Sequence, residues 1–443
     1  MKEKDKLIYL KSLGCNKNTV DSEIILSLLK KEGYKITQNP EEASSIIVNT
    51  CAFIDDAKEE AIDTILELSN IRMADAKLIV AGCFSQLYSD EILQEISEVD
   101  AVTGIGNLEG VLDAVRNSST EKDFPESRKI SNTYKEYILR NKLLTLPGYA
   151  YLKIAEGCSK NCSFCLVPKI KGKIRSRALN KILEEAKILE KKGIYELILT
   201  SQDTLNYGRD LNLQNGLKTL IDCLLNNTDI SFFRLLYLRP GYELLENLDI
   251  FENSRVLPYF DIPIQHVSKK ILLSMNRSGD YAFYKQIINK IRDKVPEAIL
   301  RTTVIVGYPG ETEEDFDTLL HFVEEMQFNH LGVFIFSPQS ETEAFKLKQS
   351  VAKKISERRK NILLETQLEI SSRYMEGNIG KVFEVLIEEK FQHINLYIGR
   401  SYHFAPEVDG VFLVRSKKAL KPGSMIKAKV TSADDYDLHG VAL

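Results

Sequence analysis

Three closely spaced cysteines are the most distinctive chemical feature of the sequence. Cys158, Cys162 and Cys165 follow the spacing C-x3-C-x2-C, and Phe164 lies inside the second gap. Thiolates at this spacing on a tight loop ligate three irons of one 4Fe-4S cube, and no other cysteine lies within 50 residues to ligate the fourth iron. The fourth iron is therefore open to a ligand that does not come from the protein.

A structural zinc loop and buried free thiols are the alternative interpretations of these cysteines. Zinc needs a fourth protein ligand, and the nearest histidine in the sequence is His266. An open iron instead resembles the radical S-adenosylmethionine (SAM) signature, in which the amino and carboxylate groups of SAM chelate that iron. We therefore interpret the three cysteines as cluster ligands and as the catalytic residues.

Length and composition are those of a multidomain globular protein. A chain of 443 residues exceeds what one hydrophobic core usually serves, which predicts two or three domains. The net charge of -4 gives no overall basic surface for nucleic acid. The charged N-terminus is unlike a signal peptide, and no apolar run reaches the ~18 residues of a membrane span. Seven cysteines in such a chain favour metal chemistry over disulfides, so we expect a cytoplasmic protein without a membrane partner.

The first 115 residues alternate short apolar strands with amphipathic helical segments, which is typical of an α/β sheet. We predict strands at residues 7–10, 45–48 and 78–81. A cysteine follows each strand, and these are Cys15, Cys51 and Cys83. Because the carboxyl ends of parallel strands share one edge of a sheet, the three thiols can converge on one site. The alternative is three buried thiols that act as small apolar side chains.

The central part of the chain predicts a partial barrel. A polar stretch at residues 117–135 is typical of a linker, and six predicted strands follow it. These strands are residues 149–154, 196–200, 233–237, 259–264, 300–306 and 331–336. Six βα units predict a partial or open (βα)6 barrel whose chemistry lies at the carboxyl ends of the strands. Polar residues there or within the fifth strand are expected to contact SAM, although turns and helix caps use the same residue types: Gln202, Asp203, Gln265 and Arg301.

The C-terminal part predicts a helix and then a small β-barrel. Residues 351–374 have a charged amphipathic pattern, and strand-like runs at 382–387, 411–414 and 425–430 lie between Gly and Pro turns. This style is typical of a five-stranded barrel. Residues 376–443 contain nine Lys or Arg and nine Asp or Glu, so the barrel lacks the cationic stripe that phosphate binding favours. A protein partner therefore fits it better than RNA.

Over essentially the whole chain the sequence resembles the radical SAM methylthiotransferases. The matching blocks include Ser-Leu-Gly-Cys15, Val-Asn-Thr-Cys51-Ala-Phe, Ala-Gly-Cys83, Tyr-Phe-Asp-Ile-Pro-Ile-Gln-His266 and the segment from Arg301 to Phe316. The resemblance implies three domains: an N-terminal methylthiotransferase domain with linker at 1–135, a radical SAM domain at 136–375 and a TRAM domain at 376–443. The implied fold class is α/β, with an N-terminal parallel-sheet α/β domain, a central partial (βα)6 barrel and a C-terminal small β-barrel.

The resemblance also implies SAM and two 4Fe-4S clusters. Cys158, Cys162 and Cys165 would hold the radical SAM cluster, and Cys15, Cys51 and Cys83 an auxiliary cluster. Members of the family use one electron from a low-potential donor, such as flavodoxin or ferredoxin, to cleave SAM to methionine and a 5′-deoxyadenosyl radical. They then transfer a methylthio group whose methyl comes from a second SAM. Phe164 is expected to pack near the adenine ring, with loop packing as its alternative role.

Two local motifs indicate the substrate. Ser201-Gln-Asp-Thr204 and the ending Asp434-Asp-Tyr-Asp-Leu-His-Gly440 resemble the RimO type, which modifies an aspartate of ribosomal protein S12. The MiaB type, which forms 2-methylthioadenosine in tRNA, typically has Gly-Gln-Asn-Val-Asn at the first position. We therefore predict methylthio transfer to the β-carbon of an S12 aspartate. The alternatives are the same chemistry on tRNA, a non-catalytic iron–sulfur electron carrier, and an RNA-binding protein with vestigial cysteines.

Overall fold

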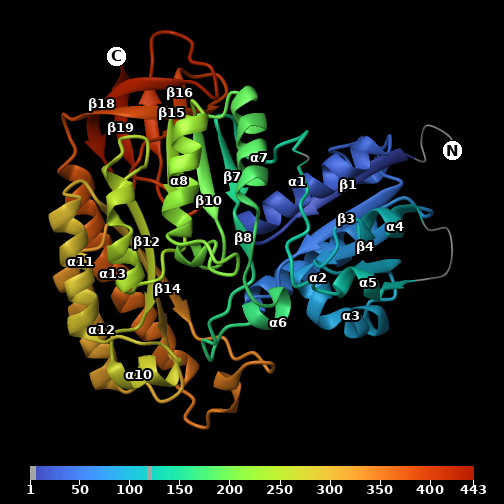
Figure 1. Ribbon diagram of the computed structural model, residues 1–443, viewed down its shortest axis with the longest axis horizontal. Helices are drawn as coiled ribbons and strands as arrows, with labels where there is room; N and C mark the ends of the chain where they lie inside the picture. Colours follow the sequence, from blue (N-terminus) through green and yellow to red (C-terminus); the bar gives the residue numbers. More distant parts are fainter. Residues whose placement is uncertain (1–5, 117–121, 139) are drawn as a thin grey trace. The chain divides into compact units, whose positions relative to one another are not determined.

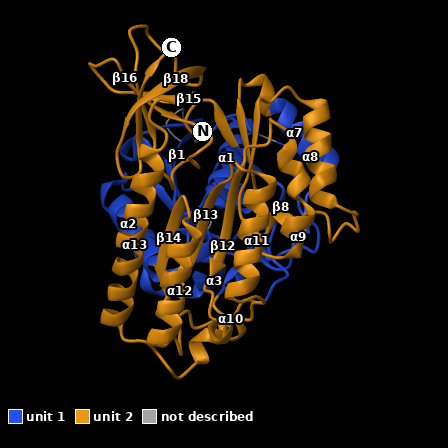
Figure 2. Cartoon of the chain, turned by 90° about the vertical axis from the view of Figure 1, so that its left-hand side faces the viewer, with its two compact units in different colours: residues 1–144, 151–161, 165–188 blue, residues 145–150, 162–164, 189–443 orange. Residues whose placement is uncertain are grey.

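The computed structural model describes residues 6–116, 122–138 and 140–443 and divides the chain into two compact units. Unit 1 comprises residues 1–144, 151–161 and 165–188, and unit 2 comprises residues 145–150, 162–164 and 189–443 (Figure 2). Within the cysteine motif, Cys158 and Cys165 are grouped with unit 1, whereas Cys162 and Phe164 are grouped with unit 2. In the described ranges, every helix is too short or too polar to cross a membrane.

Unit 1 is built on a six-stranded parallel sheet of order β2-β1-β3-β4-β5-β6 (Figure 1). Its strands are β1 (Leu7–Ser12), β2 (Lys35–Ile36), β3 (Ser45–Thr50), β4 (Lys77–Gly82), β5 (Ala101–Thr103) and β6 (Asp123–Phe124). The helices that follow are α1 (Asn16–Lys31), α2 (Asp55–Ile71), α3 (Cys83–Glu95), α4 (Gly110–Arg116) and α5 (Pro125–Arg128), with a 3₁₀ turn η2 (Pro40–Glu42) before β3. The three predicted strands are confirmed, and each is longer than predicted.

The central strand β3 is buried along its whole length because both of its faces are covered. Ile46 and Val48 face a core that also contains residues of α2 and α3, whereas Ile47 lies between them on the opposite face. Helices α1 and α4 also contact each other. Apolar side chains on both faces explain why β3 is a continuous hydrophobic run in the sequence.

The prediction of a linker at residues 117–135 is wrong for part of that stretch. Residues 117–121 lie outside the described ranges, but Asp123 and Phe124 form strand β6, which pairs in parallel with β5. Helix α5 follows directly, and Arg128 near its end forms an ion pair with Asp123. Because β6 lies at the edge of the sheet, it needs few apolar side chains, and its polar sequence therefore gives a weak strand signal.

The segment after the cysteine motif packs onto the same core. It contains the hairpin strands β8 (Ala155–Glu156) and β9 (Arg175–Ser176), helix α6 (Val167–Lys171) and helix α7 (Leu179–Lys191). Leu166 and Ile170 join the hydrophobic cluster that contains Val48 and Val80. In addition, α6 contacts α3. Unit 1 therefore combines the N-terminal sheet with a short piece of the central sequence.

Unit 2 contains two three-stranded sheets, of orders β11-β10-β7 and β12-β13-β14. The strands are β7 (Tyr149–Lys153), whose end extends into unit 1 along the chain, β10 (Glu196–Thr200), β11 (Phe232–Leu235), β12 (Tyr259–Gln265), β13 (Ile299–Val306) and β14 (His330–Ile335). In addition, Phe233 of β11 forms an isolated parallel bridge with Val256, which belongs to no named strand. All six predicted central strands are confirmed, but they form two short sheets instead of one.

Helices of unit 2 follow its strands and cover them. They are α8 (Gly216–Asn227), α9 (Tyr242–Glu246), α10 (Lys269–Ser274), α11 (Tyr281–Lys294), α12 (Glu313–Met326) and α13 (Lys353–Glu376), with 3₁₀ turns η3 (Thr204–Asn206), η4 (Leu248–Glu252) and η5 (Glu343–Lys346). Figures 1 and 2 show α11, α12 and α13 together on one face of the β12-β13-β14 sheet. This arrangement leaves the opposite face of the sheet toward the interior of the partial barrel.

The C-terminal strands form a closed five-stranded barrel of order β15-β16-β17-β19-β18. They are β15 (Val382–Lys390), β16 (Leu396–Arg400), β17 (Phe412–Arg415), β18 (Met425–Ala433) and β19 (Leu438–Ala442). Strands β17 and β19 pair in parallel, whereas the other neighbours are antiparallel. The predicted five-stranded barrel is confirmed, and its core includes Tyr397, Phe412 and Leu438.

Buried ion pairs fasten this barrel to the strands of unit 2. Arg400 of β16 lies 2.5 Å from Glu196 of β10 and 2.8 Å from Glu388 of β15. Glu196 also lies 2.6 Å from Arg234 of β11. In addition, Asp409 accepts a hydrogen bond of 2.5 Å from the hydroxyl of Tyr259, at the start of β12. The barrel is thus fixed to the amino-terminal parts of the strands, away from their carboxyl ends.

Candidate functional site

The structure brings Cys15, Cys51 and Cys83 together at the carboxyl edge of the unit 1 sheet. Cys15 immediately precedes α1, Cys51 follows β3, and Cys83 is the first residue of α3. Gly14 has φ +84°, and a Cβ built on it would lie only 2.6 Å from the Cβ of Cys51. Only glycine tolerates both this backbone conformation and this close approach. The loops that carry Cys15 and Cys51 are therefore packed against each other.

Asn18 of α1 holds the loops around this triad. Its side-chain amide donates hydrogen bonds to the backbone oxygens of Leu13, at 3.1 Å, and Thr50, at 2.9 Å. Its Oδ1 lies 3.8 Å from the Sγ of Cys83. One buried side chain thus contacts the ends of β1 and β3 and the start of α3. The sequence pattern had placed the cysteines at this edge but had given no role to Asn18.

The three thiols differ in their acidity. Burial raises the pKa of Cys15, but the charges of Lys17 and Lys171 and the amide of Asn18 outweigh it, so the pKa is lowered overall. Burial raises the pKa of Cys51 and raises that of Cys83 to about 12, and the neighbouring thiols of the triad add to both shifts. Cys15 therefore has the surroundings that most favour a thiolate, and metal ligation requires all three thiols to lose their protons.

The C-x3-C-x2-C loop is held by hydrogen bonds within each unit. In unit 1, the amide of Cys158 donates to the oxygen of Gly172 at 3.0 Å, and the amide of Lys160 donates to the Sγ of Cys158 at 3.4 Å. In unit 2, the hydroxyl of Ser163 donates to the oxygen of Ser274 at 2.8 Å. These contacts fix the loop within each unit.

Arg239 contacts the middle cysteine of this motif, and sequence reasoning missed it. Its guanidinium donates a hydrogen bond of 3.5 Å to the Sγ of Cys162. Arg239 lies four residues beyond the end of β11, just before Pro240 and Gly241. A basic residue between a strand end and a Pro-Gly turn was the available signal. Hydrogen bonds to a ligating sulfur raise the reduction potential of a cluster, so this contact suits an iron–sulfur site.

Phe164 packs in an apolar cluster of unit 2. The buried members of that cluster are Ile271, Met275, Ile305, Tyr308 and Ala344. This contact agrees with the alternative role in loop packing and leaves one part of the ring partly exposed. Adenine contact by Phe164 stays a prediction.

Gln202 and Asp203 follow β10, where the sequence pattern placed them. The Oε1 of Gln202 is buried and accepts no hydrogen bond within the described ranges. Asp203 is buried, and its Oδ2 accepts a hydrogen bond of 2.5 Å from Asn206. Gln265 ends β12 with φ +71°, a left-handed conformation that is strained for a residue with a Cβ. A strained residue and an open buried acceptor at strand ends are consistent with a ligand site there.

Arg301 lies in the amino-terminal half of β13. Its guanidinium lies 3.3 Å from Asp261 and 3.3 Å from Asp409. These two carboxylates fix the guanidinium of Arg301, and Asp409 is one of the residues that attach the C-terminal barrel. Its predicted contact with SAM is not tested by this arrangement.

A second buried network lies at the carboxyl ends of β12 and β13. His266 lies 3.4 Å from Glu311, and Arg359 of α13 lies 3.0 Å from the same carboxylate. Glu311 also accepts a hydrogen bond from the amide of Gly307. The Gly307-Tyr-Pro-Gly-Glu311 loop is thereby closed on itself. Arg359 was not foreseen, because it lies far along the chain on a helix with a charged amphipathic pattern.

The donor sets fit iron–sulfur clusters. Throughout the described ranges, no three or more His, Cys, Asp and Glu side chains are placed to hold a single metal ion. Thiolates at the corners of a cube bind different irons and are spaced more widely than the ligands of one ion. Soft thiolates without a neighbouring carboxylate or imidazole ligand favour iron–sulfur chemistry.

Three protein families match successive parts of the chain. They are described as uncharacterized protein family UPF0004 at residues 7–104, radical SAM superfamily at residues 152–323 and TRAM domain at residues 379–443. The radical SAM methyltransferase TsrM from Kitasatospora setae has a TM-score of 0.53 at 13% identity, covering 76% of this chain and 77% of that one. This likeness shows a shared fold. Together, the fold and the matches define a radical SAM enzyme, a class that uses an iron–sulfur cluster and SAM.

Curated relatives match nearly the whole chain. A protein from Acetivibrio thermocellus is 42% identical, covering 98% of each chain, and one from Aquifex aeolicus is 44% identical, covering 97% of this chain and 95% of the relative. Both are named ribosomal protein uS12 methylthiotransferase RimO. The chain belongs to the RimO family of radical SAM methylthiotransferases. The predicted family, fold class and enzyme class are therefore confirmed.

Proposed function

We propose that this chain adds a methylthio group to the β-carbon of an aspartate in ribosomal protein S12 (uS12). The observation that carries the proposal is the identity of 42% and 44% to relatives named for that substrate, over nearly the full length of each chain. The match includes the N-terminal sheet, the central strands and the C-terminal barrel. In addition, the balance of nine basic and nine acidic residues at 376–443 suits a protein substrate better than RNA.

The proposed enzyme contains two 4Fe-4S clusters. Cys158, Cys162 and Cys165 would hold the cluster that binds SAM, and the triad of Cys15, Cys51 and Cys83 would hold the auxiliary one. Support for the second site comes from the packing of Gly14 against Cys51 and from the electrostatic coupling among the three thiols. When bound, the clusters supply an electron for SAM cleavage and an iron that carries the sulfur to be transferred.

The net reaction replaces one C–H bond of the aspartate by a C–S bond. One SAM takes up an electron and the hydrogen atom and leaves as methionine and 5′-deoxyadenosine. A second SAM donates its methyl group to a sulfide-level sulfur and leaves as S-adenosylhomocysteine. Joining this methylated sulfur to the aspartate carbon radical releases one electron, which the auxiliary cluster would accept. The electron for SAM cleavage enters from a low-potential donor, for which flavodoxin and ferredoxin are the proposed classes. Because the proposed substrate is a ribosomal protein, the proposed location is the cytoplasm.

The proposed SAM contacts are Phe164, Gln202, Asp203, Gln265 and Arg301. Gln202 has the strongest support, since its buried Oε1 at the end of β10 accepts no hydrogen bond from any described residue. A hydroxyl or ammonium donor of SAM would satisfy it. Arg301 already pairs with two carboxylates, so we expect its contribution to SAM binding to be smaller than that of Gln202. The domain boundaries after residues 135 and 375 are also proposals.

The substrate is tested by offering the enzyme two candidate molecules in parallel reactions. The reduced, anaerobic enzyme receives SAM and sulfide together with either a uS12 loop peptide that contains the aspartate or a tRNA, and mass spectrometry follows each. We expect the mass gain of one methylthio group on the peptide and none on the tRNA. The peptide with asparagine in place of aspartate is the matched control. A gain on tRNA alone would refute the protein substrate and leave the radical SAM assignment intact.

A further inference from the structure

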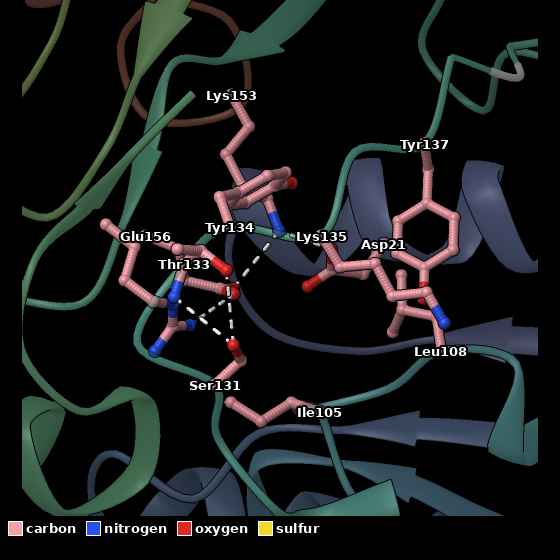
Figure 3. Close-up of a pocket in the computed structure, with 12 residues that line it drawn as sticks. Asp21, Ile105, Leu108, Ser131, Thr133, Tyr134, Lys135, Tyr137, Lys153 and Glu156 are labelled. Atoms are coloured by element: carbon pink, nitrogen blue, oxygen red, sulfur yellow. Dashed lines mark hydrogen bonds and ion pairs between the residues drawn. The ribbon is translucent and has the colours of Figure 1, made fainter. Parts of the chain in front are cut away.

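Five charged side chains form a buried network in unit 1. They are Asp21, Lys153, Glu156, Lys171 and Arg175, and each is at most 6% exposed. Glu156 is the centre, at 2.9 Å from Lys171, 3.1 Å from Arg175 and 3.2 Å from Lys153. Asp21 pairs with Lys153 and lies 3.5 Å from Lys171. Figure 3 shows Lys153, Glu156 and Asp21 around a small cavity.

This network carries an excess positive charge. It contains three cations and two carboxylates. Burial opposes ionisation, but the opposite charges outweigh it, so the pKa of Glu156 is lowered and the pKa of Lys171 is raised. A second buried network of unit 1 carries no excess positive charge, because Arg140 and Arg177 face Glu23, Glu185 and the partly exposed Glu136. The imbalance is therefore not a general property of buried charge in this unit.

Lys171 brings this excess charge to the N-terminal cysteines. It is the last residue of α6, which contacts α3, and α3 begins with Cys83. Ile170, the residue before it, shares a core cluster with Cys83. Its partner Asp21 lies on α1, which begins directly after Cys15. Consistently, the charge of Lys171 acts on the thiols of both Cys15 and Cys83.

A buried excess cation is unfavourable unless an anion compensates it. The cavity in Figure 3 has a volume of about 20 Å³, which is room for roughly one water molecule. It touches Asp21, Lys153, Glu156 and Arg175 but is not lined by Lys171. In contrast, an oxidised cube held by three thiolates carries roughly one net negative charge, and one more after reduction. A cluster on the cysteine triad therefore matches the missing charge in sign and in size.

We propose that Lys171 is a positioning residue that sets the reduction potential of the auxiliary cluster through its buried charge. The inference rests on the proposed function, because it assumes a cluster on Cys15, Cys51 and Cys83. Reduction adds one electron to that cluster, and a nearby cation favours the more negative state. Removing the cation should therefore make the cluster harder to reduce. Replacing Lys171 by a neutral residue leaves two cations and two carboxylates, so the network itself should persist.

The test uses the full chain with Cys158, Cys162 and Cys165 replaced by alanine, so that only the auxiliary cluster is loaded. Lys171→Met removes the charge and keeps the length of the side chain, whereas Lys171→Arg keeps the charge. Lys169→Met is the matched control, since Lys169 lies on the same helix and is exposed. Each protein is reconstituted anaerobically and titrated with dithionite and mediators while electron paramagnetic resonance follows the reduced cluster. Circular dichroism and iron content are measured on the same samples.

For Lys171→Met we expect the ratio of reduced to oxidised cluster at a fixed potential to fall about tenfold, or about 59 mV for one electron. One unit charge at about 12 Å in an effective dielectric constant of about 20 would have this effect. Lys171→Arg and Lys169→Met should stay within about twofold of the parent, because the first keeps the charge and the second removes a solvent-screened one.

Each other outcome is decisive. An unchanged midpoint in Lys171→Met, or an equal shift in Lys169→Met, would overturn the inference. So would a Lys171→Met protein that is unfolded by circular dichroism, because the four remaining charges balance. If the parent with intact Lys171 holds no cluster at all, the second cluster of the proposed function fails instead. Loss of the cluster from folded Lys171→Met, with retention in Lys171→Arg, would support the role of the charge.

Discussion

Arg400 is expected to be a main determinant of how firmly the C-terminal barrel is attached. Its side chain is 2% exposed and lies between Glu196 at 2.5 Å and Glu388 at 2.8 Å. Arg400→Met replaces the charged side chain with an apolar one of similar length and so removes the charge. Glu196 would still have Arg234 at 2.6 Å, whereas Glu388 would have no cationic partner among the described residues. The substitution thus isolates one buried carboxylate.

Breaking a buried ion pair by removing one partner costs about 3–5 kcal/mol, because the remaining charge stays buried and uncompensated. We expect a loss of this size in the free energy of unfolding for Arg400→Met. Adding Glu388→Gln removes the isolated charge, so the double variant should recover roughly 2 kcal/mol. Denaturation in urea, followed by circular dichroism and by proteolysis of the C-terminal barrel, measures both values.

The loss should also depend on pH. Burial raises the pKa of Glu388, although Arg400 opposes this shift, and removing Arg400 should raise the pKa further. A carboxyl group with a raised pKa in the folded state takes up a proton more readily there than in the unfolded chain. Its unfavourable effect is therefore relieved as the pH falls. The deficit of Arg400→Met should be smaller at pH 5 than at pH 8. A loss below about 1 kcal/mol, or one equal at both pH values, would refute this account of the network.

Four further predictions concern the cysteine sites and one buried histidine. The reconstituted enzyme should contain about eight irons per chain, and replacing either cysteine triad with alanine should leave about four. Cys158→Ala should abolish formation of 5′-deoxyadenosine, whereas Cys51→Ala should retain it and yield no methylthiolated peptide in the same assay. Gly14→Ala should lower the iron content toward four, because its Cβ would lie 2.6 Å from that of Cys51; Gly193→Ala, at φ +78° with nothing within 4 Å, should keep all the iron. Burial lowers the pKa of His403 to about 3 from 6.5, so the unfolded chain binds the extra proton and stability should fall as the pH drops below 6.5; His403→Gln should flatten that dependence in urea denaturation.

The strands that precede Cys51 and Cys83, β3 and β4, were predictable because they are buried on both faces. Strand β3 contains three consecutive apolar residues among its six, and the thiol of Cys51 follows it directly. A buried strand of this kind has a strong signal in any single sequence. In contrast, β2, β6, β8 and β9 have two residues each, and only pairing with neighbours defines them. Their position depends on the tertiary fold, which local sequence does not record.

The same distinction holds for the candidate sites. The cysteine spacing indicated the ligands, because the chemistry of a cluster depends on residue type and close spacing. Other residues of the sites act through contacts with residues far along the chain, and these are Arg239, Lys171 and Asn18. Asn18, for example, contacts Cys83, which lies 65 positions away. A lone basic or amide residue has no distinguishing pattern in the sequence. Arg301 lies in a strand that was predicted correctly, but its position there gave no sign of its ion pair with Asp409.

The closure of the C-terminal barrel has a consequence for biosynthesis. Strand β19 follows β15 to β18 in the chain, yet it lies between β17 and β18 and pairs with both. Until residues 438–442 have left the ribosome, β17 and β18 therefore each present an unpaired edge, which is a site for aggregation or chaperone binding. The barrel must then close after the rest of its strands have been made. The strand order thus makes the pairing of β19 with both of its neighbours the last step in building this barrel.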